Sequence, residues 1–249
     1  GGKAMVPEVE LLVRAGIPLP SGALVEHAKA RGLPVLMSAN AFARRYPRGH
    51  PREGTFRGFR TELQHLKGLN VSLDSAGFVS TVLFGGTYPW TVDQYLDLGE
   101  AFPWSSWASM DLCMEPEVAE DDAIRRLRLA ATAQNHAVCA AAAARRGLSE
   151  PMPILQGWSV SDYLLSVDWM PVAEWPSLVG VGSMCRRHIT GPNGILEVVT
   201  ALDEVLPPHV TLHLFGVKST ALPLLNALPC QQRSPGKPPR VYSTDSAAW

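Results

Sequence analysis

Candidate catalytic and binding residues stand at the ends of apolar runs along this chain. In the segment 70–78, Val71 and Leu73 alternate with polar residues, as in a short strand, and the strand ends at the carboxylate of Asp74. Such a carboxylate could do acid–base chemistry, although a single one more often only closes an Asx-type turn. The pattern carries weight because it recurs. Comparable positions after later apolar runs are held by Asp111, Gln156, Gly182, Ser183, Phe215 and Asp245.

The elements that would position these residues are eight short strands separated by helices or long crossovers. We predict strands at residues 9–13, 33–37, 71–74, 107–112, 153–155, 178–181, 211–215 and 241–246. We predict helices at residues 20–30, 92–98, 163–167, 195–206 and 221–227. A further long, Ala-rich helix is expected to start in the acidic cluster 117–122 and to end at Arg145, where its charges suit the helix dipole.

Eight βα units in 249 residues predict an α/β fold of the (β/α)8 TIM barrel type, as a single domain over residues 1–249. A doubly wound sheet is the alternative, but no GxGxxG follows the first predicted strand. The residues that follow barrel strands converge on one face, so we expect the candidate residues to share a pocket there. The chain stops at Trp249, before an eighth helix could form, and that helix is expected to be shortened or missing.

Arginines cluster in the segment after the second predicted strand. The net charge of −1 gives the whole protein no attraction to nucleic acid, so any such binding must use a local patch. The first patch is a long polar loop with Glu53 as its one acid; its cations are Arg44, Arg45, Arg48, Arg52, Arg57 and Arg60. Arg186 and Arg187 form a second patch after the sixth strand. For the loop, phosphate contact and simple solvation are both open explanations.

Cysteine usage and hydropathy indicate a cytoplasmic protein. The four cysteines are scattered and form no CxxC, which suits a reducing compartment. No apolar run is long enough for a membrane span, so no membrane partner is expected. Cys185 and His188 have a CxxH spacing but lack a second pair of ligands. We therefore expect no metal site, no structural zinc and no cofactor.

Taken together, six segments resemble motifs of the tRNA-guanine transglycosylase superfamily. The segment 74–78 is similar to Asp-Ser-Gly-Gly-aromatic, 110–113 to Phe-Asp-Glu-Cys, and 155–157 to Val-Gln-Gly-Gly. The segment 181–184 is similar to Ile-Gly-Gly-Leu, 214–217 to Leu-Met-Gly-Val, and 243–246 lies where the family has its nucleophile segment Phe-Asp-Cys. The pieces 182–187 and 245–249 most resemble the DNA-acting branch, the DpdA-type enzymes of phages and bacterial genomic islands, which place 7-deazaguanines in DNA.

The resemblance implies a base exchange at C1′ through a covalent Asp–glycosyl intermediate, with Asp245 as the nucleophile and Asp74 as the general acid/base. It also implies that Asp111 accepts hydrogen bonds from the guanine N1–H and amine, that Phe78 and Phe215 sandwich the ring, and that Cys113 borders position 7. The other implied contacts to the base come from Ser75, Gln156, Gly157, Gly182 and Ser183. The implied partners are DNA, a 7-deazaguanine base such as preQ0, and accessory proteins.

Structural explanations of the same residues stay open. Asp111 could only cap the next helix, Phe78 and Phe215 could be core aromatics, Cys113 a small buried residue, and Gln156 a partner of rim backbone groups.

Three other functions compete with DNA base exchange. A tRNA enzyme is disfavoured because the chain lacks the Cys-x-Cys-x2-Cys zinc cluster of those enzymes, and it also has Leu112 in place of a Glu and Ala76 in place of a Gly. A non-catalytic subunit is disfavoured because both Asp74 and Asp245 are present. An unrelated barrel hydrolase is the third.

Overall fold

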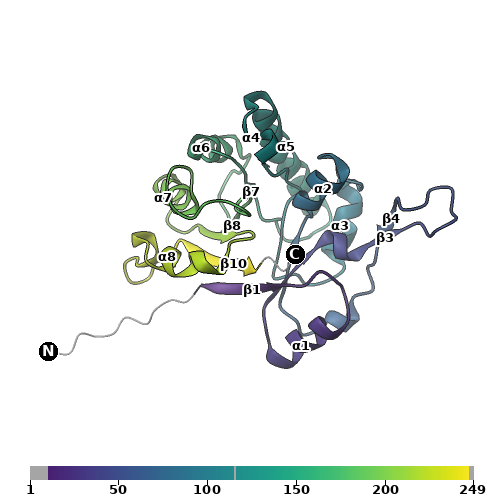
Figure 1. Ribbon diagram of the computed structural model, residues 1–249. Helices are drawn as coiled ribbons and strands as arrows, with labels where there is room; N and C mark the ends of the chain where they lie inside the picture. The colour runs from purple at the N-terminus through teal and green to yellow at the C-terminus, as the bar shows by residue number, and fades with distance from the viewer. Residues whose placement is uncertain (1–10, 115, 247–249) are drawn as a thin grey trace.

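A curled sheet of eight parallel strands forms the centre of the computed structural model, which describes residues 11–114 and 116–246 (Figure 1). The strands are β1 (Leu12–Gly16), β2 (Val35–Ser38), β5 (Val71–Asp74), β6 (Ser106–Trp107), β7 (Ile154–Leu155), β8 (Leu178–Val181), β9 (Thr211–Leu214) and β10 (Val241–Ser246). Their order is β6-β5-β2-β1-β10-β9-β8-β7, so the first and last strands of the chain pair in the middle of the sheet. Each of the eight predicted strands has a counterpart, in a TIM-like arrangement, but the strand predicted at 107–112 is only the short β6 at Ser106–Trp107. Residues 9 and 10 of the first predicted strand lie outside the described residues.

The two edges of the sheet approach each other between β6 and β7. Ala108 and Met152 form a parallel bridge. The amide of Met152 donates to Trp107 O at 2.7 Å, and the amide of Ser109 donates to Met152 O at 3.0 Å. These bonds supply partners for backbone groups that an open edge would leave to solvent.

The first strand extends further than the sequence predicted. We expected it to stop at Arg14, but β1 continues to Gly16. Arg14 is only 4% exposed, and its guanidinium donates to Val35 O, to Asn70 Oδ1 and to Ser105 Oγ. A cation can occupy this interior position because these three acceptors replace its water.

Helices follow the strands and cover the outside of the sheet (Figure 1). The predicted ones are α1 (Ala23–Arg31), α3 (Val92–Glu100), α5 (Asp122–Arg145), α6 (Val160–Trp169), α7 (Ile195–Val205) and α8 (Leu222–Asn226). Two apolar clusters fill the space between helices and sheet, one beneath α1, α3 and α5 and one beneath α6, α7 and α8. The eighth helix was predicted to be shortened or missing. Residues 247–249, which follow β10, lie outside the described part of the chain, so this stays a prediction.

Two predictions about the helices need correction. The helix expected from residue 117 is divided into a short α4 (Pro116–Ala119) and α5, which starts after Asp121 caps the amides of Ala123 and Ile124. A further helix, α2 (Gly77–Phe84), was not predicted, because its β-branched and aromatic residues have low helix propensity. Short 3-10 turns lie at Ala39–Phe42, Gln64–Leu66, Ser219–Ala221 and Pro229–Gln231.

The arginine-rich segment is a β-hairpin rather than the predicted loop. Strands β3 (Ala43–Arg45) and β4 (Phe56–Phe59) pair antiparallel, and the hairpin projects away from the body of the molecule (Figure 1). Phe56, Phe59 and Trp90 pack against one another at ring-centroid distances of 4.9–5.3 Å. This aromatic cluster anchors the base of the hairpin to the segment before α3.

Two residues of the motif segments adopt left-handed backbone conformations where the tRNA enzymes have glycine. Ala76 has φ 70° and Ser183 has φ 58°. A side chain in this region costs about 1–2 kcal/mol, which explains why glycine suits both positions.

The left-handed conformation at Ala76 predicts an unusual response to glycine. Ala76→Gly should leave the free energy of unfolding unchanged or raise it by up to about 1 kcal/mol, because relief of strain offsets the lost methyl group and the added chain entropy. Ala143→Gly is the matched control: Ala143 is equally buried, at 1% exposure, but lies inside α5, where glycine should cost about 1 kcal/mol or more. Urea denaturation of both variants measures the difference. Equal losses at the two sites would contradict the argument.

Candidate active site

A pocket lies at the carboxyl ends of the strands and is lined by most of the predicted site residues. They are Asp74, Phe78, Asp111, Cys113, Gln156, Gly182, Ser183, Arg186, Phe215 and Asp245, together with residues that sequence analysis did not select: Leu36, Met114, Pro116, Cys185 and Gly216. The prediction that Asp74, Asp111, Gln156 and Asp245 share one pocket is confirmed. The roles assigned to them stay predictions.

Asp111 is held in a network of hydrogen bonds from three elements. Ser75 Oγ donates to Asp111 Oδ1 at 2.9 Å, and Gln156 Nε2 donates to Oδ2. Tyr88, which sequence analysis missed, clamps the backbone: its hydroxyl accepts from Asp111 N at 2.9 Å and donates to Asp111 O at 2.6 Å. A side chain on Gly77 would meet Asp111 O at 2.6 Å, so only glycine fits there. The 7% exposed carboxylate therefore has a fixed orientation.

Gln156 connects this network to the segment after β8. Its Oε1 accepts from Ser183 Oγ, and Ser183 Oγ accepts from the amide of Met114 at 2.7 Å. A side chain on Gly182 would lie 2.2 Å from Gln156 Nε2, so glycine is required at that position too. The side-chain amide of Gln156 is thus fixed with its nitrogen toward Asp111 and its oxygen toward Ser183. Gln156 can be fully buried because both of these polar atoms have hydrogen-bond partners.

The environment of the pocket raises the pKa of two carboxyl groups. Burial, together with the nearby charges of Asp111 and Asp245, raises the pKa of Asp74 to about 8. Burial also raises the pKa of Asp111 to about 6, while the hydrogen bonds from Ser75 and Gln156 act in the opposite direction. Near neutral pH, Asp74 is therefore mainly protonated and Asp111 mainly ionised. One can donate a proton while its neighbour can accept hydrogen bonds.

Asp245 is 2% exposed and bonded through one of its two oxygens. Its Oδ1 lies 3.0 Å from His213 Nε2 and accepts from the amide of Gly216 at 3.1 Å. His213 Nδ1 lies 2.7 Å from Ser243 Oγ, so the imidazole bridges the two side chains. Sequence analysis missed His213, although its alternation with Phe215 along β9 marks both as residues of one face of the strand.

The predicted ring-binding residues line the same pocket from different elements. Phe78 lies in the first turn of α2 and Phe215 follows β9, where its ring packs edge-on against His213 at 4.5 Å. Cys113 is buried, with its Sγ 3.3 Å from Thr81 Oγ1. The sandwich of a base between the two phenyl rings stays a prediction.

Comparison with known protein families identifies the family of this chain. The family model described as "DpdA: DeoxyPurine in DNA protein A" matches residues 54–234, which is more than half of the chain. The chain belongs to the DpdA family. A search of curated proteins finds no match. The matched range contains Asp74, Asp111, Gln156 and Phe215, whereas Asp245 follows it. At the level of the family, this makes the chain a transglycosylase of DNA deazapurine modification that has DNA as its substrate.

Three residues predicted to contact substrate lie behind the DpdA pocket instead. Ser75 is fully buried and its hydroxyl supports Asp111. Gly157 is buried beneath Tyr163 and its carbonyl accepts from Arg187. Arg187 itself is 7% exposed and donates to the backbone oxygens of Ser183, Trp158 and Asn193 as well. Its guanidinium is fully occupied, so it braces the loops after β7 and β8 and is not available to a phosphate.

The remaining arginines predicted to bind nucleic acid stand on exposed parts of the DpdA chain. Arg44, Arg45, Arg48 and Arg52 are exposed along the hairpin, and Arg186 is exposed at the pocket. Two of them also pack on aromatic rings: Arg45 lies over Phe84, the last residue of α2, and Arg52 lies over Tyr46.

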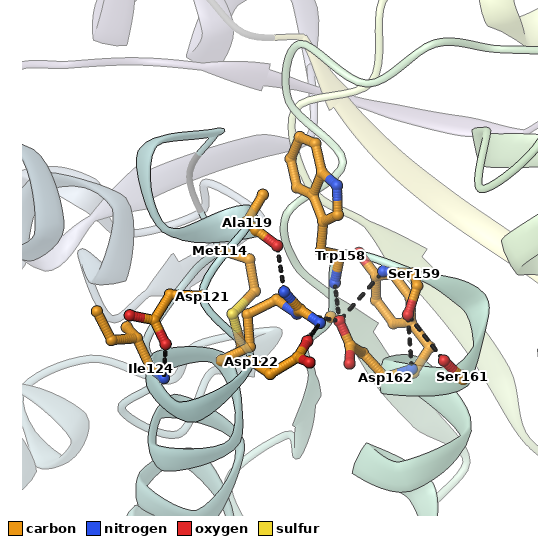
Figure 2. A network of polar contacts seen from close by, with 12 residues as sticks. Met114, Ala119, Asp121, Asp122, Ile124, Trp158, Ser159, Ser161 and Asp162 are labelled. Atoms are coloured by element: carbon orange, nitrogen blue, oxygen red, sulfur yellow. Dashed lines mark hydrogen bonds and ion pairs between the residues drawn. The ribbon is translucent and has the colours of Figure 1, made fainter.

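A second polar network lies at the starts of α5 and α6 (Figure 2). Asp162 Oδ2 accepts from the amides of Trp158 and Ser159 and from Arg125 Nε at 3.0–3.2 Å. Arg125 also donates to Ala119 O and to Asp122. The network therefore joins the starts of α5 and α6, and with them the loops that carry Met114 and Gln156.

No group of three or more His, Cys, Asp or Glu side chains within residues 11–114 and 116–246 is arranged to hold a metal ion. The absence of a cofactor and of structural zinc stays a prediction. In the same part of the chain, no helix is both long and apolar enough to cross a membrane.

The raised pKa of Asp74 predicts a pH-dependent stability. The folded protein retains this proton up to about pH 8, whereas the unfolded chain releases it near the ordinary aspartate pKa of 3.8, so the free-energy penalty on folding grows as pH rises through this window. Asp74→Asn removes the penalty. Its free energy of unfolding, relative to the unmodified protein, should therefore increase between about pH 5 and pH 8, by roughly 1–3 kcal/mol.

Chemical denaturation at several pH values measures this difference. Asp168→Asn, the same substitution at an exposed position of α6, is the control for the change in side chain. A difference for Asp74→Asn that does not vary with pH would contradict the raised pKa.

Proposed function

We propose that this DpdA-family protein replaces guanine in DNA with a 7-deazaguanine base of the preQ0 type, through a covalent intermediate on Asp245. The observation that carries the proposal is the convergence of three carboxyl groups on one pocket: Asp74 and Asp111, whose pKa values are raised to different extents, and Asp245, which is hydrogen-bonded through one oxygen. Base exchange needs a proton donor, a hydrogen-bond acceptor for the base and a nucleophile, and the three carboxyl groups can divide these tasks.

In the first step, a carboxylate oxygen of Asp245 attacks C1′ of the target deoxyguanosine. The C1′–N9 bond breaks, and the proton of Asp74 passes to the departing guanine, so that neutral guanine and a deoxyribosyl ester of Asp245 form. The elevated pKa of Asp74, about 8, supports this role because the group carries its proton near neutral pH.

In the second step, the incoming 7-deazaguanine loses its N9 proton to the Asp74 carboxylate, and N9 attacks C1′. The ester bond breaks and Asp245 regains its carboxylate, as in a retaining glycosidase with a base in place of water. Both steps need Asp74 in opposite protonation states, and its elevated pKa suits a group that gives and then recovers a proton.

Asp111 is the group we assign to base recognition. It is mainly ionised near neutral pH and can accept from guanine N1–H and the exocyclic amine, which are donors in both the outgoing and the incoming base. The bonds from Ser75 and Gln156 occupy one acceptor site on each carboxylate oxygen and leave others toward the pocket. Phe78 and Phe215 would stack on the ring, and Cys113 would lie beside position 7.

The hairpin is the surface we assign to the DNA backbone. The hairpin projects from the body of the protein (Figure 1) and its arginines are exposed. Arg45 stacks on Phe84 at the end of the helix that begins with Gly77 and Phe78. Contact with phosphate at the hairpin and at Arg186 would bring a flipped or single-stranded base to the pocket. We also infer that the sheet is a closed (β/α)8 barrel in a single domain, which the bridge between Ala108 and Met152 supports.

The proposal predicts different defects for the two catalytic carboxyl groups. Asp245→Asn should abolish covalent capture of labelled DNA on a denaturing gel while base and DNA binding persist, because an amide is nearly isosteric but a poor nucleophile. Asp74→Asn should slow the reaction by about 10²–10⁴-fold but leave the attacking carboxylate in place. An adduct that forms in Asp245→Asn would show that another residue attacks. Transfer of labelled preQ0 to tRNA rather than DNA would overturn the choice of polymer.

The hairpin assignment predicts a change in salt dependence. Substitution of Arg44 and Arg48 together by Gln should weaken DNA binding for every sequence and reduce the slope of log K against log salt by about 2, because two phosphate contacts are lost. Affinity for the free base should not change. Arg31→Gln and Arg145→Gln together are the control, since both residues are exposed at the C-terminal ends of helices, on the opposite face of the sheet. An equal loss in the control would contradict the assignment.

A further inference from the structure

His213 is a buried, titratable side chain to which the proposed mechanism gives no task. It is 1% exposed, lies on β9 beside the nucleophile strand β10, and is absent from the residues that line the pocket. A charged or polar ring in this position needs partners, and it has two: Asp245 Oδ1 at 3.0 Å and Ser243 Oγ at 2.7 Å.

We propose that His213 is a positioning residue which, with the amide of Gly216, holds Oδ1 of Asp245 so that Oδ2 is the attacking oxygen; this inference rests on the proposed function. An ionised carboxylate only accepts, so the nitrogen that faces it, Nε2, carries the hydrogen. The bond between Nδ1 and Ser243 Oγ fixes the ring orientation. No described residue donates a hydrogen bond to Oδ2, whereas Oδ1 has two donors.

The same two donors stabilise the covalent intermediate. When Oδ2 bonds to C1′, Oδ1 becomes the ester carbonyl oxygen and continues to accept from His213 and Gly216. When the incoming base breaks the C1′–Oδ2 bond, the electron pair returns to the carboxylate and the two donors stabilise its charge. Negative charge leaves the Asp245 carboxylate in the first step and returns to it in the second. The donors on Oδ1 therefore assist the first step by orienting Oδ2 for attack, and they assist the second by stabilising the carboxylate as it is released.

A deoxyribose substrate makes these donors more important. In retaining glycosidases, hydrogen bonds that involve the sugar 2-hydroxyl strengthen in the transition state. DNA has no 2′-hydroxyl, so the sugar cannot contribute one. The donors on Oδ1 must come from the protein, and His213 and the Gly216 amide are the two that the structure provides.

A matched pair of substitutions tests the hydrogen bond. The amide of His213→Gln can place a donor near the position of Nε2, whereas His213→Met has a similar shape and no donor. We measure single-turnover formation and breakdown of the DNA adduct, with the fraction of competent sites determined by base binding. His213→Met should slow both steps by about 10²-fold with unchanged affinity for base and DNA, and His213→Gln should recover most of the loss. Equal losses in the two variants would overturn the proposal, because a merely structural ring does not distinguish them.

Nitrogen-15 NMR of histidine-labelled protein tests the geometry independently of turnover. We expect Nε2 of His213 to carry a proton and its resonance to shift in Asp245→Asn. A ring protonated only at Nδ1 would overturn the proposal. Failure of the two ideas is distinguishable. Absence of any adduct with the unmodified protein would refute the proposed function, whereas an adduct with equal rates in the Gln and Met variants would refute only the role of His213.

Discussion

Three carboxyl groups crowded into one pocket are the constraint on which the rest of this structure depends. Like charges at short range in a poorly solvated site disfavour full ionisation, and the fold must treat the three groups differently. Asp111 receives hydrogen bonds on both oxygens, Asp245 receives two on a single oxygen, and Asp74 retains its proton. The chemical differentiation of three identical side chains is therefore a property of their neighbours.

The neighbours come from separate parts of the chain, and close backbone packing brings them together. Gly77 and Gly182 allow Asp111 and Gln156 to approach the backbone at distances that no side chain would permit. Ala76 and Ser183 take left-handed conformations to turn the chain at the same ends of their strands. Ser183 also uses its hydroxyl to fix Gln156, so this residue combines a strained backbone with a role in the hydrogen-bond network.

The pocket and the hairpin, to which the proposal assigns the base and the DNA backbone, are two regions of different character. The pocket residues are held by hydrogen bonds between separate segments, and the network of Arg125 and Asp162 joins the starts of α5 and α6, which follow the loops after β6 and β7. The hairpin is a protruding arm held at its base by Phe56, Phe59 and Trp90. The contact between Arg45 and Phe84 connects the arm to α2, the helix that also carries Phe78.

The sequence by itself determined the strands and the carboxyl-end residues. Alternation of apolar and polar residues, interrupted by glycine and proline, located all eight strands, and parallel strands place the residues that follow them on one face. Motif order then identified Asp74, Asp111, Gln156 and Asp245 as a group, and the pocket contains all four. Local sequence patterns suffice to predict these features, because the spacing of apolar residues locates the strands and the order of the motifs along the chain locates the residues at their ends.

Only the tertiary structure decided which residues support the site and which are available to a ligand. Arg187 and Ser75 resemble ligand contacts in sequence, but their partners are backbone and side-chain groups tens of residues away. Tyr88 carries no local pattern that marks it. The alternation of His213 with Phe215 indicates its side of the strand but not its contact with Asp245, which lies on another strand. The helix α2 and the hairpin likewise depend on packing that propensity does not report. Burial and long-range hydrogen bonds set these roles, and neither is encoded within a short stretch of sequence.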